Sequence, residues 1–359
     1  MLFKLMQFFQ QDLSLLNVFR YITFRTILAT LTSMSLCLFL GGWVIRKLRE
    51  KQIGEKIREY GPESHHSKKG TPTMGGCLIV PAVLLSTLLW ADPGNIYVWI
   101  VVFVAVSFGA IGFLDDYLKV SGKGGRGLGA RYKIAFQVVA AFLVSLVLYV
   151  YPGFDLYLNV PFFKNVVPYL GIGYIALSVF IIVGASNAVN LTDGLDGLAI
   201  SPLIVAFSSY VAFTYFAGNV KIASYLQIPY VVGSGELSIM CGAAVGAGLG
   251  FLWYNSYPAE VFMGDVGSLP MGALLGTVAV ITKQELVLAL VGGLFVFEAL
   301  SVIFQVAYFK LTGGKRIFRM APIHHHFELK GWPEPKVIVR FWIIAIVLAL
   351  MSIGTLKLR

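Results

Sequence analysis

The stretch 97–117, YVWIVVFVAVSFGAIGFLDDY, decides the fold class. Its first eighteen residues carry no charge, which approaches the roughly 20 apolar residues that a helix needs to cross the hydrocarbon layer of a membrane. Two adjacent aspartates, Asp115 and Asp116, follow directly. The stretch therefore predicts a transmembrane helix that brings two carboxylates to one membrane surface.

The composition of the whole chain is also that of a membrane protein. Of its 359 residues, 57% are hydrophobic and only 13% are charged, and there are 38 glycines besides. A water-soluble globule with so few charged residues could not cover its own surface, which excludes a soluble enzyme, a disordered regulator and a fibrous protein. Cys37, Cys77 and Cys241 stand singly in apolar segments, so neither a disulfide framework nor a thiolate metal site is expected.

Ten apolar runs approach the length of a membrane span. We predict an all-α polytopic integral membrane protein with about ten transmembrane helices, one domain over residues 1–359, and an interfacial helix over residues 1–21. The eighth and ninth runs are the least secure, because the eighth is short and only Lys283, Gln284 and Glu285 separate the pair. The runs are 26–44, 73–90, 97–114, 134–151, 169–189, 198–217, 237–253, 268–282, 286–309 and 341–356.

Basic residues gather in three connections between these runs. Of 28 Lys and Arg, eight lie in 45–72, five in 115–133 and six in 310–336. Cytoplasmic loops collect Lys and Arg, so these nineteen place the three connections inside and, with ten spans, both termini on the periplasmic side. Topology explains the positive charge, so nucleic acid is not expected as a partner. The loops predicted to form a functional face are 45–72, 115–133, 190–197, 254–267 and 310–336.

Five of the eight aspartates fall on this cytoplasmic face. Adjacent carboxylates repel each other unless a cation or a shared proton relieves them, and Mg²⁺ suits such oxygens where phosphates supply further ligands. Asp193 and Asp196 would share one helix face if the sixth helix began there. The pattern predicts a site for a metal ion and an anion. The five are Asp115, Asp116, Asp193, Asp196 and Asp265.

Three segments on the same face could contact the anion. The glycine-rich loop 121–129, SGKGGRGLG, could wrap phosphate oxygens with backbone N–H groups, although it lacks the Walker spacing. The segment 67–76, SKKGTPTMGG, is a second basic turn. In 321–332, APIHHHFELKGW, three consecutive histidines cannot all face one metal from a helix or strand, so a zinc site made by them alone is not expected. One or two of them hydrogen-bonding a diphosphate suit this face better.

Two features lie inside the spans. Gly242, Gly246 and Gly250 form a small-xxx-small ridge, which predicts close helix packing. Glu298 is the only acid in the middle of a span. Secondary transporters place ionisable groups and broken helices near the midplane. A transporter of an anionic nucleotide-sugar is therefore the alternative class of protein, although nearly all the acids gather at one surface instead.

Together these motifs resemble the polyprenyl-phosphate N-acetylhexosamine-1-phosphate transferase superfamily, and within it the phospho-N-acetylmuramoyl-pentapeptide-transferase family. The similarity runs essentially end to end. The segment through GWPE, 331–334, resembles this branch more than its GlcNAc-1-phosphate relatives, which remain the second alternative. The motifs are GTPTMGG at 70–76, DD at 115–116, NAVNLTDGLDG at 187–197, FMGDVGS at 262–268 and APIHHH at 321–326.

The resemblance implies a reaction and a place for it. Phospho-MurNAc-pentapeptide would pass from UDP-MurNAc-pentapeptide to undecaprenyl phosphate, giving lipid I and UMP, with Mg²⁺ as the cofactor. The enzyme would be a multi-pass protein of the bacterial cytoplasmic (inner) membrane, embedded in the lipid bilayer with its active site facing the cytoplasm. Direct attack or a phospho-aspartate intermediate, the identity of the base, the role of Glu298, and action as a monomer or homodimer all stay open.

The resemblance also implies roles for individual residues. Asp265 is the implied Mg²⁺ ligand, and Asp115 and Asp116 are implied to serve attack by the lipid phosphate. His324 joins these three as a catalytic residue, and the three histidines with Lys68 and Lys133 contact the diphosphate. The implied substrate-binding residues are Lys68, Thr73, Lys119, Lys133, Asn187, Asn190, Asp193, Asp196, Asn255, Phe262, His325 and His326.

Overall fold

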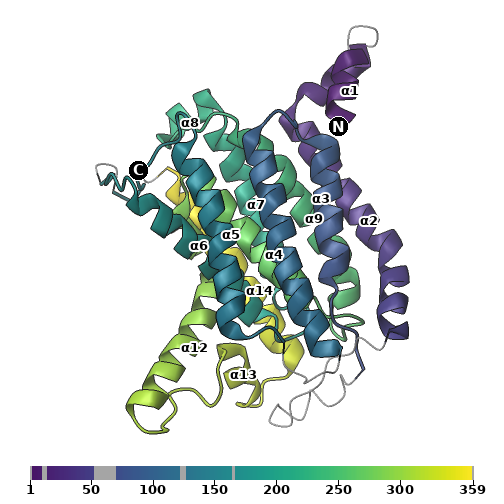
Figure 1. Cartoon of the computed structure of the whole chain (residues 1–359), viewed down its shortest axis with the longest axis vertical. Helices are drawn as coiled ribbons and strands as arrows, with labels where there is room; N and C mark the ends of the chain where they lie inside the picture. Colours follow the sequence, from purple (N-terminus) through teal and green to yellow (C-terminus); the bar gives the residue numbers. More distant parts are fainter. Residues whose placement is uncertain (1, 10–13, 52–69, 122–126, 164–165, 358–359) are drawn as a thin grey trace.

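The computed structural model describes residues 2–9, 14–51, 70–121, 127–163 and 166–357. These residues form a bundle of helices. Among the described residues, one isolated β-bridge has both partners placed, and it joins Tyr157 to Tyr169. The first helix and the end of the last helix lie at the same end of the bundle (Figure 1). The prediction of an all-α polytopic membrane protein is confirmed.

Eight of the described helices are long and apolar enough to cross a membrane, and two shorter helices are also apolar. Together they correspond to the ten predicted runs. The long helices are α2 (Ile22–Glu50), α4 (Ile96–Val120), α5 (Ala130–Val150), α6 (Gly173–Thr192), α7 (Ile200–Ala217), α9 (Leu237–Asn255), α12 (Gly293–Leu311) and α14 (Glu334–Thr355). The shorter two are α3 (Gly76–Trp90) and α10 (Asp265–Ile281).

Short helices complete the chain at both ends of the bundle. Within the predicted helix over residues 1–21, the described residues form α1 and a 3₁₀ helix, η1. The ninth predicted run is divided at Gly292, which separates α11 from α12. The short elements are α1 (Leu2–Phe9), η1 (Ser14–Arg20), α8 (Val220–Leu226), η3 (Ser234–Glu236), α11 (Glu285–Val291) and α13 (Ile323–Glu328).

The turn between α10 and α11 identifies the eighth and ninth runs as separate crossings. Tyr174, the second residue of α6, donates its hydroxyl to the carbonyl of Val280 at 3.2 Å. The start of α6 and the end of α10 therefore lie at the same end of the bundle, opposite to the start of α10. A helix of this length extends about 25 Å, close to the thickness of the hydrocarbon layer.

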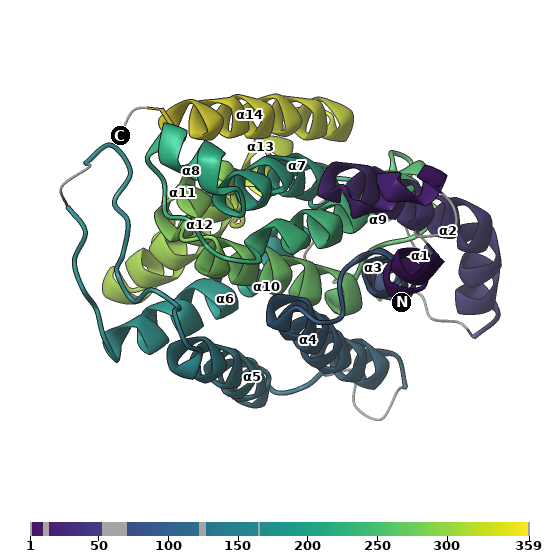
Figure 2. The ribbon, with the colours of Figure 1, turned by 90° about the horizontal axis from the view of Figure 1, so that it is seen from above.

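Helix α10 is the centre of the molecule (Figure 2). All of its residues are buried, and it packs against α3, α4, α6, α7 and α11. A helix that is apolar on every side is expected to be enclosed in this way. Its first residue, Asp265, is consequently held among several other helices at one end of the bundle.

The predicted glycine ridge packs α9 against α2. A Cβ atom added at Gly246 would lie 1.9 Å from the carbonyl oxygen of Thr30, and one at Gly250 would lie 2.7 Å from that of Met34. Such distances leave room only for glycine, so the backbones of the two helices are in direct contact. The packing interpretation of the ridge is confirmed.

A buried ion pair holds the end of the bundle where the chain begins. The Arg25 guanidinium donates to the two carboxylate oxygens of Glu236 at 2.8 and 2.7 Å, and to the carbonyl of Trp90 at 3.1 Å. Glu236 also accepts from the backbone N–H of Asp92 at 2.8 Å. Because Arg25 is 2% exposed, this pair is shielded from water and ties α2, α3 and η3 together.

Candidate active site

Glycines bring three helices into backbone contact at the start of α10. A Cβ atom at Gly112 of α4 would lie 2.1 Å from the carbonyl oxygen of Asp265. A Cβ atom at Gly76 of α3 would lie 2.1 Å from the backbone nitrogen of Gly267. Gly264, just before α10, has a φ of +69°, and a Cβ atom there would lie 2.7 Å from Asp116 Oδ2. Side chains at these positions would separate the helices that carry the acids.

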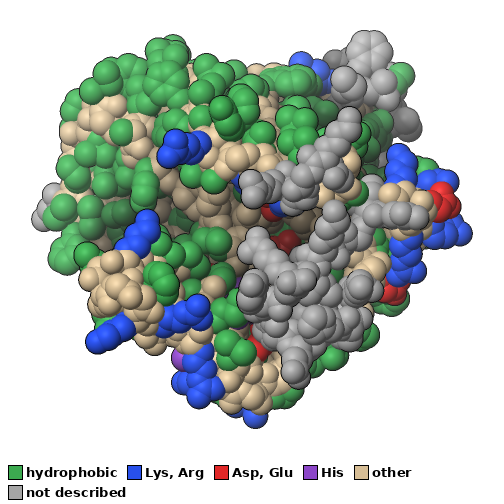
Figure 3. All heavy atoms as spheres, turned by 60° about the horizontal axis from the view of Figure 1, so that its bottom comes forward, with side chains coloured by type: hydrophobic (Ala, Val, Ile, Leu, Met, Phe, Trp, Pro, Cys, Tyr) green, Lys and Arg blue, Asp and Glu red, His purple; other side chains and the backbone are tan. Residues whose placement is uncertain are grey.

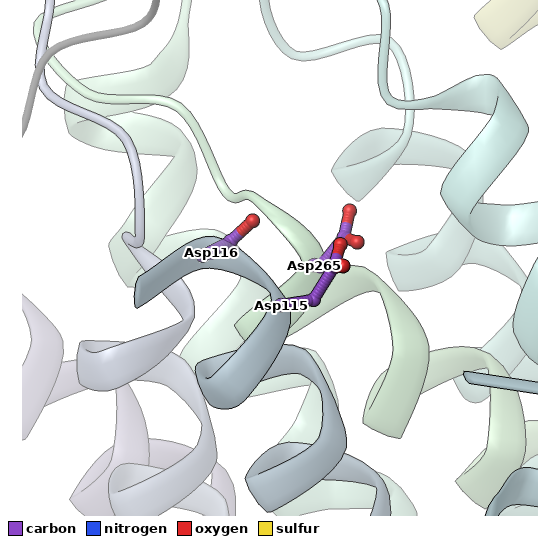
Figure 4. A group of neighbouring side chains, drawn as sticks. All are labelled: Asp115, Asp116 and Asp265. Atoms are coloured by element: carbon purple, nitrogen blue, oxygen red, sulfur yellow. The ribbon is translucent and has the colours of Figure 1, made fainter. Parts of the chain in front are cut away.

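The contact places Asp115 and Asp116 of α4 beside Asp265 of α10 (Figure 4). Their three nearest carboxylate oxygens lie within 4.8 Å of one another, and all three residues are buried. We call this group the acidic triad. Backbone N–H groups hold two of its members, since Leu128 donates to Asp115 at 2.7 Å and Val266 donates to Asp116 at 3.2 Å.

Two lysines partly neutralise the acidic triad. The Lys119 ammonium lies 2.7 Å from Asp115, 3.1 Å from Asp116 and 3.1 Å from Asp265. Lys133 forms ion pairs with Asp115 and Asp265. Three carboxylates against two ammonium groups leave one negative charge in excess when all are ionised. The side chain of Lys119 is 44% exposed, so it has room to leave, whereas that of Lys133 is 15% exposed.

The acidic triad has the character of a cation site. Its carboxylates already share one cation, because the ammonium of Lys119 lies within 3.1 Å of all three. Hard oxygen donors are the ligands that Mg²⁺ prefers, so the residues present fit such an ion. The sequence prediction named only Asp265 as a metal ligand. The geometry adds Asp115 and Asp116 to the candidate set.

The end of α6 lies against the start of α10. Asn190 accepts a hydrogen bond from the Ser268 hydroxyl at 2.7 Å, and Asp193 accepts one from the Gly264 N–H at 3.1 Å. The condition for Asp193 and Asp196 to share a helix face is not met, because α6 ends at Thr192 and α7 begins at Ile200. The expectation of a shared face is therefore wrong, since the two acids lie on a turn-rich connection.

Asp196 and Asn255 organise the loop after α9. Asp196 accepts from the backbone N–H of Ala259 at 2.9 Å. Asn255 accepts from the N–H of Gly197 at 3.1 Å and donates to the carbonyl of Val261 at 2.8 Å. Both are at most 2% exposed. Their side chains thus connect residues 193–197 to residues 256–261, next to the acidic triad.

Thr73 and Phe262 lie at another edge of the acidic triad. The N–H of Phe262 donates to the carbonyl of Pro72, and its carbonyl accepts from Gly75, both at 2.8 Å. A Cβ atom at Gly264 would lie 3.0 Å from Thr73 Oγ1, so this hydroxyl is close to the start of α10. Lys68, residues 122–126 of the glycine-rich loop and most of 45–72 lie outside the described residues.

The three histidines lie on α13 and face three different partners, as expected of consecutive residues. His324 is completely buried, with Nδ1 3.2 Å from Oε1 of Glu298. The Nδ1 atom of His325 lies 2.7 Å from a carboxylate oxygen of Glu328. His326 and His325 are partly exposed, and His326 accepts a hydrogen bond from the backbone N–H of Arg319 at 3.0 Å.

Positive charge surrounds His326. Partial burial, together with Lys330 and Arg319, holds the pKa of His326 below its ordinary value.

Figure 3 shows this end of the molecule, where Lys and Arg side chains lie around a recess in which acidic side chains are visible. The upper left of the same view is covered mostly by hydrophobic side chains. The face thus combines buried acids with exposed basic groups.

Sequence reasoning did not include two glutamines that connect site residues. Gln305 of α12 accepts from the N–H groups of Ile317 and Phe318 at 3.0 and 2.9 Å, which fixes the approach to α13. Gln137 of α5 is completely buried and accepts from the side-chain amide of Asn187 at 2.7 Å. Each is an isolated polar residue in a predicted apolar run, and this was the signal available in the sequence.

Fold and site together define a multi-pass membrane protein with a buried acidic triad at one polar end. Residues 98–283 match the model of glycosyl transferase family 4, and residues 68–80 match signature 1 of phospho-N-acetylmuramoyl-pentapeptide-transferase. Proteins named phospho-N-acetylmuramoyl-pentapeptide-transferase from Syntrophus aciditrophicus, Desulfatibacillum aliphaticivorans and Desulforapulum autotrophicum are 64%, 60% and 58% identical to it, over 100% of each chain. The chain belongs to the phospho-N-acetylmuramoyl-pentapeptide-transferase family, which confirms the resemblance.

Proposed function

We propose that this chain transfers phospho-MurNAc-pentapeptide from UDP-MurNAc-pentapeptide to undecaprenyl phosphate, giving lipid I and UMP in a bacterial inner membrane. The single observation that carries the proposal is the convergence of three buried carboxylates and two lysines at one polar end of an apolar bundle. A water-soluble nucleotide and a membrane-held phosphate can meet only at such a surface. The names of the full-length relatives support the transferred group.

The site is proposed to face the cytoplasm. Residues 310–336, which run from the last two residues of α12 to the start of α14, carry six basic residues at the same end of the bundle as the acidic triad. Cytoplasmic segments collect such residues. In this orientation the soluble UDP-linked substrate would reach the site from the cytoplasm.

Mg²⁺ is the proposed cofactor, with Asp115, Asp116 and Asp265 as the residues that would hold it. When bound, the ion supplies neutralisation of charge on phosphate oxygens. The donor set supports this choice, because it consists of carboxylate oxygens only. Activity should accordingly require Mg²⁺ or Mn²⁺ and disappear in a chelator.

The chain's own residues contribute positioning and charge. The reaction breaks one phosphoanhydride and makes one, so it is close to balanced, and catalysis consists mainly of bringing two phosphates together. Lys119 and Lys133 are proposed to contact the diphosphate. Asp115 and Asp116 are proposed to serve attack by the lipid phosphate. A general base has little to contribute, because the second proton of the lipid phosphate has a pKa of about 6 and is mostly lost near neutral pH.

The nucleotide is proposed to lie on the side of the acidic triad formed by residues 187–197 and 255–262. Hydrogen bonds from Gly264 to Asp193 and from Ser268 to Asn190 support this, since they join that side to the start of α10. His325 and His326, which are partly exposed, are proposed to contact the diphosphate. The remaining proposed contacts are Lys68, Thr73, Asn187, Asp196, Asn255 and Phe262.

The test is a reaction with purified protein in detergent, radiolabelled UDP-MurNAc-pentapeptide and undecaprenyl phosphate, with products separated by chromatography. We expect UMP and a lipid-linked product in equal amounts with Mg²⁺, and neither after chelation. Uptake of intact nucleotide into proteoliposomes without release of UMP would instead identify a transporter. A strong preference for UDP-GlcNAc would assign the chain to the sister branch.

A further inference from the structure

Glu298 is a buried acid that the proposed reaction does not use. It lies in α12 within the otherwise uncharged segment 293–309 and is completely inaccessible to solvent. Ionisable residues inside membrane spans are costly and usually face a partner within the bundle. The partner here is His324 of α13, whose ring is also completely buried and whose Nδ1 lies 3.2 Å from Oε1 of Glu298.

The opposite edge of the His324 ring lies against Gly194. A Cβ atom added at Gly194 would lie 2.4 Å from Nε2 and 2.9 Å from Cε1 of the ring. The imidazole therefore fills the space between the middle of α12 and the connection 193–197. Leu195 and Leu198 pack in one apolar cluster with Leu294 of α12 and the start of α14, which holds the two sides of the ring together.

The connection supported by His324 leads directly to the acidic triad. Asp193, the residue before Gly194, accepts the hydrogen bond from Gly264, which immediately precedes Asp265. Asp196, two residues after Gly194, accepts from Ala259 in the loop that follows α9. A displacement of Gly194 would thus move both acids that are proposed to line the nucleotide side.

We infer that Glu298 and His324 are positioning residues that hold the 193–197 connection, and with it the nucleotide side of the site, so that His324 does not have the catalytic role that the resemblance implies. The Glu298 carboxylate lies 3.2 Å from Nδ1 of His324 without aligned hydrogen-bond geometry, and its negative charge in this buried place favours the tautomer that carries the proton on Nδ1. The ring in turn sets the position of Gly194. This inference rests on the proposed function only in taking residues 193–197 as part of the nucleotide side.

The inference predicts a change in the affinity for the nucleotide substrate and not in the rate of the chemical step. Glu298→Gln should raise the KM for UDP-MurNAc-pentapeptide about tenfold, because residues in one contact network are coupled by this order of magnitude. The KM for undecaprenyl phosphate and the kcat should stay near wild type. Gly194→Ala should have the same effect, because its added methyl group presses on Nε2 from the other side.

Two further variants separate positioning from a general loss of stability. His324→Asn should raise the same KM, and combining it with Glu298→Gln should add nothing, because both changes act through one contact. The matched control is Glu285→Gln, which also removes a buried carboxylate but lies at the opposite end of the bundle, where the Tyr174 hydroxyl at the start of α6 donates to it. It should alter the thermal unfolding temperature without altering either KM.

The tautomer of His324 provides a readout independent of turnover. In ¹⁵N-histidine-labelled protein, the His324 signal, identified by its loss in His324→Asn, should report a protonated Nδ1 in the wild type and a mixture of tautomers in Glu298→Gln. Gly194→Ala keeps Glu298 intact and tests the inference even if Glu298→Gln does not fold.

Three results would overturn the inference. Folded Glu298→Gln protein with an unchanged nucleotide KM would reduce the pair to a structural contact, and additive effects in the double variant would have the same meaning. A fall in kcat at constant KM would place His324 among the groups that touch the reacting atoms. If the wild type releases no UMP, the proposed function fails, while the tautomer measurement still decides whether the pair exists.

Discussion

Replacing Gly112 by alanine tests whether the contact between α4 and α10 sets the geometry of the acidic triad. The added Cβ atom would lie 2.1 Å from the carbonyl oxygen of Asp265 and 2.5 Å from its carbonyl carbon. Real Cβ atoms stay at least 3.0 Å from such neighbours, and backbone atoms inside two helices cannot turn away. The helices must therefore separate by about 0.9 Å, the difference between 3.0 and 2.1 Å.

This separation acts on the acidic triad because Asp115 and Asp116 lie three and four residues after Gly112, about one helical turn further along α4. Both would move away from Asp265 by a similar distance. Misplacement of catalytic groups by 1 Å can cost about 10²-fold in rate, so we expect kcat for UMP release to fall by about this factor. Overpacking should also lower the stability by about 1–3 kcal/mol, which a thermal melt in detergent would measure.

Gly109→Ala is the matched control, on the same helix and three residues earlier. Its added Cβ atom would lie 3.7 Å from a methyl group of Val80, an ordinary contact. Both substitutions gain the same helix propensity, so the difference between them isolates the contact with α10. We expect the kcat of Gly109→Ala to stay within about twofold of wild type. Folded Gly112→Ala protein with a similarly unchanged kcat would refute the reasoning.

Three other predictions address the acidic triad, the orientation and the opposite end of the bundle. Asp265→Asn should reduce kcat by about 10³-fold, or about 4 kcal/mol, with little change in the detergent melting temperature; activity within a few-fold of wild type would exclude it as a metal ligand. A cysteine introduced at 330 should react with an impermeant reagent only from the cytoplasm and one at 158 only from outside, and labelling of 330 from outside would contradict the proposed orientation. Arg25→Gln should destabilise the protein by about 3–5 kcal/mol by leaving Glu236 buried without its partner, while kcat measured on folded protein stays unchanged; a melting temperature equal to wild type would show that the pair contributes nothing.

The number of crossing helices was predictable because each apolar run must be long enough to span the hydrocarbon layer. The helix ends were not predictable in the same way. Helix α4 continues to Val120, six residues past the end of its apolar run, because a helix needs no apolar side chains once it leaves the membrane. The break at Gly292 was also missed, since hydropathy does not distinguish a continuous helix from two helices joined at glycine.

The acids of the candidate site were predictable as a set, but their grouping was not. Asp265 is about 150 residues from Asp115 in the chain, and their meeting depends on glycines in two different helices that allow backbone contact. The pairing of Glu298 with His324 likewise requires the tertiary packing of α13 against α12. Local periodicity does not encode such contacts. A single sequence therefore indicates which residues belong to the site, but not which of them contact each other.

Lys119 supplies part of the positive charge that the acidic triad needs. Its ammonium is carried one turn beyond Asp115 and Asp116, so it is a tethered competitor for any divalent ion that enters. Competition from a group on the same helix weakens the apparent affinity for the ion and speeds its exchange. If the acidic triad binds Mg²⁺ as proposed, this tethered cation would take the place of the ion during a shortage of magnesium, and the rate of the enzyme would follow the free magnesium of the cell.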